Sequence, residues 1–486
     1  MKYANFLDPR EVEEIRQIRK ALEANSNPTT TDIAALTQGG ALSRQWLDGE
    51  MVAIVSTNED FRFLKSMPTR SVDQTLAEFT KQSSHGTNRH YNSSFVGQSD
   101  NPKLSDAQLK RLYDEMCYLS EGGIVNKAAT IVKSIQDPEL VQQNSATNRL
   151  MQSLATNVWY GDKTINSLEF SGFAKAIKSA GTGLVYDCRG SLPGVDVISD
   201  FVAKIRTRYF GLANQIWYAP GTRNLVNNTY QNSGNVTVWQ NNNQNPGNIS
   251  IGNKVKGYLA SEAANDGELQ IMSDLWLDRS NMDVPRIPNP ANPLTEIEGA
   301  TGPNAPAMPS FALASVPVVV GSLFDAPYAG LTGYRVAAVN KGECSVAAPI
   351  ATVTSVVGGG VTITITPADA ITESFKLYRE TKPGSGIYRW FADVARAVTP
   401  TTVYTDLNFD LPGMSIAVMG DFNSRSQTDQ TRTFVMSELM PLLKTVYPYG
   451  IGGVSVKQQL LSLDYFCVLQ FLAIEKFVLF TNVPVA

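Results

Sequence analysis

Residues 137–177 read DPELVQQNSATNRLMQSLATNVWYGDKTINSLEFSGFAKAI. Asp137 can accept hydrogen bonds from the first free amides of a helix, and Pro138 suits the first helical position. Apolar side chains then recur near helical spacing, at Leu140, Val141, Leu150, Met151, Leu154, Val158 and Trp159. The pattern predicts a helix of about 22 residues, roughly 33 Å long, that ends at Gly161. A second amphipathic element is expected within residues 168–177.

The composition is that of a large protein with more than one core. The chain has 486 residues, of which 43% are hydrophobic and 18% are charged. One core seldom organises so long a chain, so about two to four structural units are expected. The formal net charge of −4 gives no electrostatic reason for tight binding to nucleic acid.

Cysteine spacing and hydropathy argue against a disulfide-rich, zinc-binding, secreted or membrane-spanning protein. Cys117, Cys188, Cys344 and Cys467 form no C-x-x-C pair, so neither a disulfide framework nor a zinc site is expected. Cys117 and Cys467 have aromatic neighbours and are expected to be buried or inert thiols. The first 20 residues of the sequence lack the apolar segment of a signal peptide, and charges interrupt the apolar residues 465–480. We expect a soluble chain made in a cytoplasm.

The chain before the long helix is mostly polar. Residues 8–24 have a helix start signal and one apolar face, which predicts a helix. Residues 65–98 are rich in Thr, Ser, Asn, Gln, Lys and Arg, which predicts a long polar hairpin with its tip at 83–94; a disordered surface loop is the alternative. Residues 107–120 fit the periods of both helix and strand.

The part that follows alternates between helix and strand patterns. We expect a helix at 197–209, a buried strand at 215–220, an exposed Asn-rich loop at 227–248 and a strand at 268–277. Residues 283–309 are too rich in Pro, Gly and Asn for a packed element, so they mark a boundary.

Beyond this boundary the sequence pattern is that of a small β domain. Short β-rich runs occur at 333–340, 360–367, 374–380, 387–394 and 402–407. Gly, Pro and Asn turns separate them, as in an antiparallel sandwich. Gly358–Gly360 is expected to be a turn between strands, because a strand and not a helix follows. Residues 460–474 and 476–483 look like two adjacent strands that need a partner surface.

Several stretches together resemble the tailed-phage major capsid proteins of the Hong Kong 97 type. The predicted helix, its WYGD break at 159–162 and the following LEFSGFAKAI resemble the spine helix and first axial segment of that family. The run LTQGGAL at 36–42 resembles the family's N-terminal arm. The resemblance is closest to the Twort type of large contractile-tailed phages, whose capsid proteins carry an immunoglobulin-like insertion. It implies an α+β fold with an inserted all-β sandwich of fibronectin-like or bacterial immunoglobulin-like form.

The resemblance also implies a division of the chain. The expected parts are an N-terminal arm (1–50), an extended loop region (51–103), a peripheral domain with the spine helix (104–165), an axial domain (166–300), the immunoglobulin-like insertion (310–412) and a return to the axial and peripheral domains (413–486). In this scheme residues 107–120 are a strand of the peripheral domain. The two apolar runs after residue 460 are its closing strands, packed on the spine helix. The extended loop reaches over a neighbouring subunit.

Motifs for chemistry are missing from the sequence. His85 and His90 lie in the polar hairpin without the H-E-x-x-H spacing of zinc ligands. The sequence contains neither a G-K-[ST] phosphate loop nor a G-x-S-x-G nucleophile elbow. We therefore expect no catalytic, cofactor-binding or metal site, and a protein that is not an enzyme.

The function implied by the resemblance is structural. The chain would self-assemble into hexamers and pentamers of an icosahedral capsid enclosing phage double-stranded DNA. Assembly would take place in the host bacterial cytoplasm, and the protein would be located in the virion capsid. The implied partners are further copies of the chain, the portal, a scaffold or maturation protease and a decoration protein, with only weak, non-specific proximity to DNA and no membrane. The alternative is a surface adhesin or a carbohydrate- or protein-binding module, which predicts secretion.

Two groups of residues are candidates for assembly. Lys65, Arg70 and Arg89 are candidate intersubunit contacts with carboxylates such as Glu11 and Glu14; a solvated charged face is the alternative. The expected core of the spine helix consists of Leu150, Leu154, Val158 and Trp159.

Overall fold

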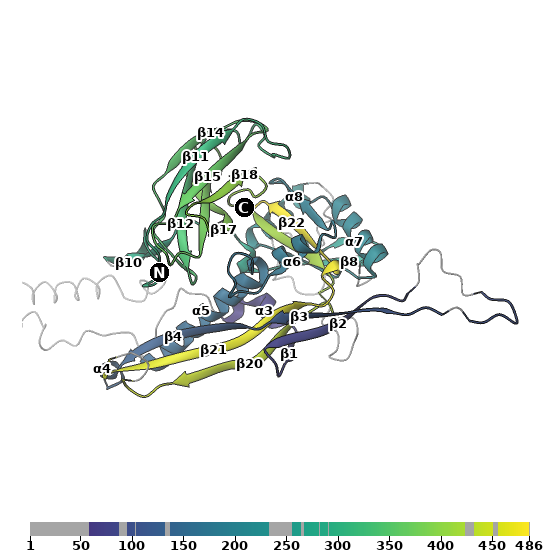
Figure 1. The fold of residues 1–486 in the computed structure, drawn as a ribbon, viewed down its shortest axis with the longest axis horizontal. Coiled ribbons are helices and arrows are strands. Elements are labelled where there is room, and N and C mark those ends of the chain that lie inside the picture. The colour runs from purple at the N-terminus through teal and green to yellow at the C-terminus, as the bar shows by residue number, and fades with distance from the viewer. Residues whose placement is uncertain are drawn as a thin grey trace, which may run out of the picture.

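The computed structural model combines an elongated helix-and-sheet layer, a mixed-sheet domain and a β-sandwich (Figure 1). A two-stranded arm projects from the elongated layer. The residues that the structure describes are 58–86, 95–102, 104–131, 137–232, 255–263, 267–280, 282–289, 291–422, 432–450 and 455–485. The expected helix at 8–24 and the LTQGGAL run lie outside these residues.

The long helix forms as the sequence predicts. Helix α5 (Pro138–Tyr160) begins after Asp137, whose side chain accepts a hydrogen bond from the Glu139 amide at 3.0 Å. It packs on a sheet with the order β1–β20–β21–β4. These strands are β1 (Thr69–Ser71), β20 (Phe434–Val446), β21 (Gln458–Phe471) and β4 (Cys117–Asn126). Pro441 lies inside β20 where its register with β21 is irregular, a place where strands tolerate proline.

The projecting arm is a hairpin of β2 (Leu76–Ser84) and β3 (Gln108–Glu115). The ambiguous residues 107–120 are therefore extended, but they belong to two strands. The first half returns along the hairpin, and after Met116 the chain enters β4. The expectation of a single strand is wrong, because β3 pairs with β2 whereas β4 pairs with β21; the assignment to a peripheral domain stays a prediction.

A mixed sheet forms the second part, with the order β5–β22–β19–β6–β8–β7. Its strands are β5 (Val185–Asp187), β22 (Phe477–Val483), β19 (Ser415–Gly420), β6 (Gln215–Tyr218), β8 (Glu268–Ser273) and β7 (Gly257–Leu259). Its helices are α6 (Phe173–Ala180), α7 (Val195–Tyr209) and α8 (Pro220–Asn232). Apolar residues of α7 and of this sheet form one buried cluster.

Three expectations for this region and its neighbours are corrected. The two terminal apolar runs are not neighbours, because the turn η3 (Ile474–Lys476) sends β22 into the mixed sheet while β21 stays beside β4. The first residues of the expected Asn-rich loop, 227–232, continue α8. The Pro-rich boundary contains a hairpin of β9 (Arg286–Asn289) and β10 (Asn292–Glu298). Its register shifts between Asn292 and Glu296, the stretch that contains Pro293.

The predicted antiparallel sandwich is confirmed. One sheet has the order β11 (Ser310–Val316), β15 (Gly360–Thr366), β18 (Thr402–Asp406). The other contains β12 (Gly330–Asn340), β13 (Glu343–Cys344), β14 (Ala351–Ser355), β16 (Ser374–Glu380) and β17 (Tyr388–Ala395). Alternate residues such as Val361, Ile363 and Ile365 point into the core between the sheets. Gly358, with φ +72°, forms the predicted turn before β15.

The remaining described elements are short. They are η1 (Asn58–Asp60), α3 (Arg62–Ser66), α4 (Lys127–Ile131) and η2 (Leu275–Leu277). Within the described part of the chain, no helix combines the length and apolarity needed to cross a membrane.

Candidate assembly surfaces

The C-terminal end of α5 lies at the meeting point of the elongated layer and the mixed sheet. Trp159 is fully buried, with ring centroids 4.4 Å from Phe63 of α3, 5.3 Å from Phe173 of α6 and 6.2 Å from Trp217 of β6. Further aromatic rings extend this contact to β20 and β22 through Phe434. Aromatic rings stabilise a fold through their large buried area and their ring–ring contacts. Because these rings come from α3, α5, α6, β6, β20 and β22, the cluster holds those elements in fixed positions relative to one another.

A polar contact orients Trp159 within the cluster. Its indole Nε1 donates to Asp274 Oδ2 at 3.1 Å, and the Trp276 amide donates to the other carboxylate oxygen. Burial raises the pKa of the Asp274 carboxyl, which these hydrogen bonds partly oppose. Leu150, Leu154 and Val158 are also buried along α5, so all four residues expected in the spine-helix core lie in the interior.

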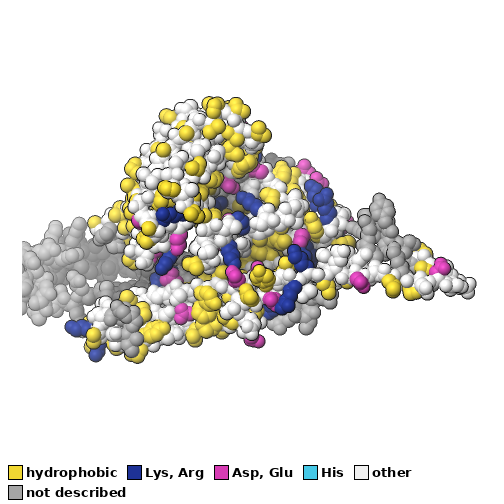
Figure 2. Space-filling view, in the orientation of Figure 1, with side chains coloured by type: hydrophobic (Ala, Val, Ile, Leu, Met, Phe, Trp, Pro, Cys, Tyr) yellow, Lys and Arg dark blue, Asp and Glu magenta, His cyan; other side chains and the backbone are white. Residues whose placement is uncertain are grey.

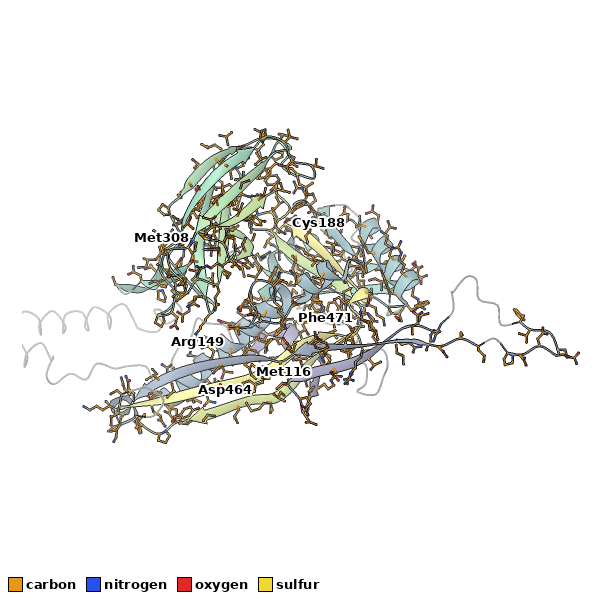
Figure 3. The ribbon with its side chains drawn as sticks, viewed as in Figure 1. Met116, Arg149, Cys188, Met308, Asp464 and Phe471 are labelled. Carbon is orange, nitrogen blue, oxygen red and sulfur yellow. The ribbon has the colours of Figure 1, made fainter. Side chains whose placement is uncertain are left out.

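The hairpin arm is anchored at its base by polar contacts. Gln470 of β21 donates from Nε2 to the Ala77 carbonyl oxygen at 2.8 Å and to Asp114 at 3.2 Å, tying both hairpin strands to the sheet. Further out, Lys81 Nζ lies 2.6 Å from Glu475 Oε2. Met116 and Phe471 lie near the place where the arm leaves the sheet (Figure 3).

Beyond its base the arm exposes apolar side chains to solvent. Leu109 and Tyr113 of β3 are 66% and 65% exposed, and towards the tip Phe95 and Leu104 are 96% and 90% exposed. A groove of about 330 Å³ runs between the hairpin, α6 and β21. An arm that buries so little apolar surface within its own chain is suited to bury it against another one.

The charged candidates for intersubunit contacts differ in their surroundings. Lys65 is exposed on α3. The half-buried Arg70 donates from Nη2 to Gln470 Oε1 at 2.5 Å and to Ser437 Oγ at 3.2 Å, and burial followed by the nearby charge of Arg432 lowers its pKa. Side chains of β20 and β21 thus hold Arg70 against the sheet. Glu11, Glu14 and Arg89 lie outside the described residues, so contacts between subunits stay a prediction.

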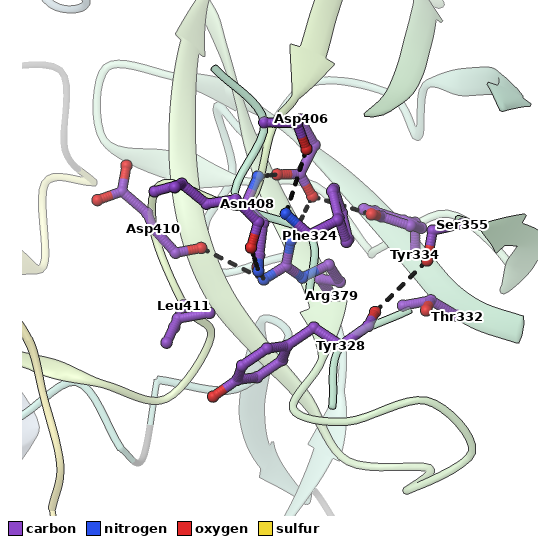
Figure 4. A network of polar contacts seen from close by, with 12 residues as sticks. Phe324, Tyr328, Thr332, Tyr334, Ser355, Arg379, Asp406, Asn408, Asp410 and Leu411 are labelled. Atoms are coloured by element: carbon purple, nitrogen blue, oxygen red, sulfur yellow. Dashed lines mark hydrogen bonds and ion pairs between the residues drawn. The ribbon is translucent and has the colours of Figure 1, made fainter. Parts of the chain in front are cut away.

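The sandwich is joined to the mixed sheet by a polar network. At its centre Arg379 and Asp406 form a buried ion pair of 2.5 Å, and Arg379 also donates to Asn408 Oδ1 at 2.7 Å (Figure 4). Arg189, from the mixed-sheet domain, donates to the carbonyl oxygens of Asn408 and Leu323 at 2.7 and 2.5 Å. The Leu323 carbonyl oxygen also accepts from Asn408 Nδ2 at 2.9 Å, so Arg189 connects the mixed-sheet domain to carbonyl groups of the sandwich that belong to the same network.

Asn482 of β22 adds a second tie to the sandwich. Its side-chain amide donates to the Phe409 carbonyl oxygen at 2.7 Å, and its Oδ1 accepts from the Leu411 amide at 2.7 Å. The Asn482 side-chain amide also donates to Asp187, the last residue of β5, at 2.7 Å. One residue therefore joins the mixed sheet to the segment through which the chain leaves the sandwich.

An aromatic contact joins the sandwich to the end of α5. The Arg279 guanidinium lies 3.6 Å from the ring centroid of Trp390 and 4.3 Å from that of Tyr160, whose hydroxyl donates to the Leu277 carbonyl oxygen. A cation between two aromatic faces is favourable when water is excluded. Close by, Lys376 and Asp393 face each other across β16 and β17.

The described residues were compared with the requirements of a metal site. In the residues described, no group of His, Cys, Asp and Glu is arranged to hold a metal ion. His85 is exposed and contacts Gln82, and His90 is outside the described residues. On the face shown in Figure 2, acidic and basic side chains are interspersed.

Sequence reasoning missed the residues that fix the sandwich. Arg189, Arg279, Trp390 and Asn482 belong to no motif, and their partners are distant in the sequence. The positive φ of Arg189 (47°) and Asn482 (54°) is a local constraint that no sequence pattern here announced. Only the assembled structure brings these residues together.

Known proteins related to this chain were found by sequence and by structure. No protein-family model matches the chain. The chain is 26% identical over 276 residues to the major capsid protein of Staphylococcus phage K, a match that covers 53% of this chain and 56% of the relative. The chain thus spans about half the length of that relative in the match.

Solved structures of low sequence identity align over almost the whole chain. A chain from Microbacterium phage Oxtober96 has a TM-score of 0.46 and 8% identity, covering 93% of this chain and 98% of the other. A chain from the capsid of a native GTA particle has a TM-score of 0.43 and 10% identity, covering 94% and 100%.

The sequence match confirms the predicted resemblance to major capsid proteins of tailed phages. The particular relative, from Staphylococcus phage K, agrees with the predicted closeness to the Twort type.

Proposed function

We propose that this chain is a phage major capsid protein of the Hong Kong 97 type that assembles with copies of itself into an icosahedral shell. The similarity to the phage K capsid protein carries the proposal. The structure supports it with an arm whose apolar side chains, including Leu109 and Tyr113, are left exposed by the chain itself. Burial of these side chains between subunits supplies a hydrophobic driving force for association.

The parts of the chain have distinct roles in this proposal. The elongated layer with α5 is the peripheral domain, the mixed sheet is the axial domain, and the β2–β3 arm is the extended loop that reaches over a neighbouring subunit. Residues 310–412 form the insertion. The role is structural and not enzymatic, its place is the virion capsid, and assembly occurs in the bacterial cytoplasm.

The further partners belong to the same proposal. Copies of the chain form the hexamers and pentamers, a portal occupies one vertex, and a scaffold or maturation protease acts during assembly. A decoration protein binds the outer surface. Packaged double-stranded DNA lies near the shell without tight binding, in keeping with the formal net charge of −4.

Imaging of the expressed chain tests the proposal. The full chain is purified alone and after co-expression with phage assembly factors, and particles are examined by size-exclusion chromatography and electron microscopy. We expect capsomers or closed shells built from hexamers and pentamers. Monomers alone under every condition, with the fold intact by circular dichroism, would falsify the proposal.

A further inference from the structure

Two of the four cysteines face each other across a strand ladder. Cys117, the first residue of β4, is the register partner of Cys467 in β21. Residues directly opposite in a ladder point to the same side of a sheet. Both thiols accordingly contact the same core cluster, in which Cys467 is fully buried and Cys117 partly buried.

The ladder places these thiols within bonding reach. Directly opposed residues of an antiparallel pair have Cα atoms about 4.5 or 5.5 Å apart, depending on the hydrogen-bonding position. Disulfides join residues whose Cα atoms are about 4.4 to 6.8 Å apart. Both ladder spacings fall in that range. Formation of the bond also requires the Cβ atoms, about 4.5 to 5.5 Å apart in opposed residues, to approach to about 3.5 to 4.5 Å, so a small shift of the strands accompanies rotation of the side chains.

Only one of the two thiols is open to a reagent. Cys117 borders the hairpin groove and also a second groove of about 290 Å³, between β4, α5 and the turn after β12. Cys467 is covered by the sheet and its neighbours. Cys117 is therefore the thiol that a soluble oxidant meets first, and Cys467 is placed to react second.

We propose that Cys117 and Cys467 form a reversible cross-strand disulfide. The Cys117 thiolate attacks a disulfide oxidant such as oxidised glutathione, which breaks the oxidant's S–S bond and releases one glutathione thiolate. The Cys467 thiolate then attacks the Cys117 sulfur of the mixed disulfide and releases the second glutathione. The two protein thiols lose two protons and two electrons, and the oxidant is reduced to two glutathione molecules.

The surroundings make this reaction slow at neutral pH. Burial raises the pKa of the Cys117 thiol to about 11 and raises that of Cys467 further. Since the thiolate is the nucleophile, the rate rises about tenfold per pH unit well below the pKa. A reducing compartment keeps the thiols free.

A functional consequence follows if the proposed function holds. Subunits would assemble with free thiols in the reducing cytoplasm and gain the crosslink after release into oxidising surroundings. The bond joins β4 to β21 beside the base of the arm and closes residues 117–467 into a loop. Crosslinks that close longer loops constrain the unfolded chain more.

Peptide mapping of the full chain tests the crosslink. The purified protein is incubated with oxidised glutathione at pH 7 and pH 9, alkylated, digested without reductant and analysed by mass spectrometry. We expect a linked pair of peptides containing Cys117 and Cys467, formed roughly 100-fold faster at pH 9. Cys117→Ser and Cys467→Ser should each abolish it, whereas the matched control Cys188→Ser should retain it.

Thermal unfolding provides the second readout. The oxidised protein should unfold at a higher temperature than the reduced one, with the difference reversed by dithiothreitol and missing in Cys467→Ser. A lasting glutathione adduct on Cys117 without the linked peptides, or a native link that uses Cys188 or Cys344, overturns the proposal. If the serine variants do not fold, the map of the unaltered chain decides. The test needs no shells, so its failure leaves the proposed function untouched.

Discussion

Leu154 and Leu140 lie on the same helix, but their surroundings differ. Leu154 of α5 is 4% exposed in the core, whereas Leu140 near the start of the helix is 50% exposed. We expect Leu154→Asp to cost several kcal/mol, out of the roughly 5–15 kcal/mol that usually stabilises a fold, because it buries an unpaired charge. The yield of soluble protein and the unfolding temperature should both fall sharply for this variant. The control Leu140→Asp should stay near the wild type; shells at wild-type yield from Leu154→Asp would contradict this packing.

Mutation of the buried ion pair of Arg379 and Asp406 tests the role of charge in the sandwich, as mutation of Leu154 tests apolar burial in the helix core. Arg379→Met should destabilise the sandwich by about 3–5 kcal/mol, because Asp406 keeps a buried charge without its partner. The double variant Arg379→Met/Asp406→Leu removes both charges and should recover much of the loss. Hydrogen exchange of β15 and β16 in the full chain measures the effect. Equal protection in the single and double variants would show that the charge left behind is not the cause.

Among helices and strands, the sequence could predict those that depend on local signals and could not predict those that depend on pairing with distant strands. Helix α5 was predictable because its start signal at Asp137 and its apolar period lie within the element itself. The sandwich strands were predictable for the same reason: alternation and turn residues are local. The sheets that β21 and β22 join could not be predicted, because both runs are apolar and only hydrogen bonds to distant strands decide between the sheets.

The site shows the same division. The buried face of α5 follows from its periodicity, so Leu150 to Trp159 could be named from the sequence. Arg189 and Trp390 could not, since each acts through partners that the fold alone supplies. The hairpin of β9 and β10 was missed because proline content outweighed the weaker strand signal in residues 286–298.

The arm allows a test that separates association from folding. Leu109→Asp and Tyr113→Asp change side chains that are already in solvent, so the stability of the free subunit should change by no more than about 0.5 kcal/mol. Shell formation should nevertheless decrease, because each charge would have to be buried at an interface. Light scattering during assembly and the unfolding temperature give the two readouts. Val403→Asp, exposed on the sandwich, is the control; wild-type assembly of both arm variants would exclude the arm from the interface.

At the scale of the whole molecule, the contacts of the sandwich with Arg189 and Asn482 determine what the insertion adds to the stability of the chain. Replacing residues 310–412 with a short Gly/Ser linker should leave the two framework sheets folded, because loop length changes closure entropy by only roughly 0.6 kcal/mol per doubling. The loss of contacts to Arg189 and Asn482 should lower the unfolding temperature. Shells of unchanged geometry that lack density for the sandwich are expected by electron microscopy.

Arg189→Ala in the full chain is the milder companion to this deletion. It removes the guanidinium donors to the Asn408 and Leu323 carbonyl oxygens, while Asn408 Nδ2 still donates to Leu323. The expected cost is about 1–3 kcal/mol where the sandwich meets the mixed-sheet domain, with little change within the sandwich. Hydrogen exchange at residues 323 and 408–411 should increase selectively. A deletion variant that is folded but never assembles would mean that the sandwich itself supplies contacts between subunits.

The positions of β21 and β22 have a consequence for synthesis. Strand β21 lies between β20 and β4, and β22 between β5 and β19, so residues 458–483 complete both framework sheets. The sandwich strands instead occupy one continuous segment, 310–406. Since domains fold as units while the ribosome is still working, the insertion can be finished when both sheets still lack an inner strand. A nascent chain that stalls before residue 458 therefore cannot complete either the β1–β20–β21–β4 sheet or the mixed sheet.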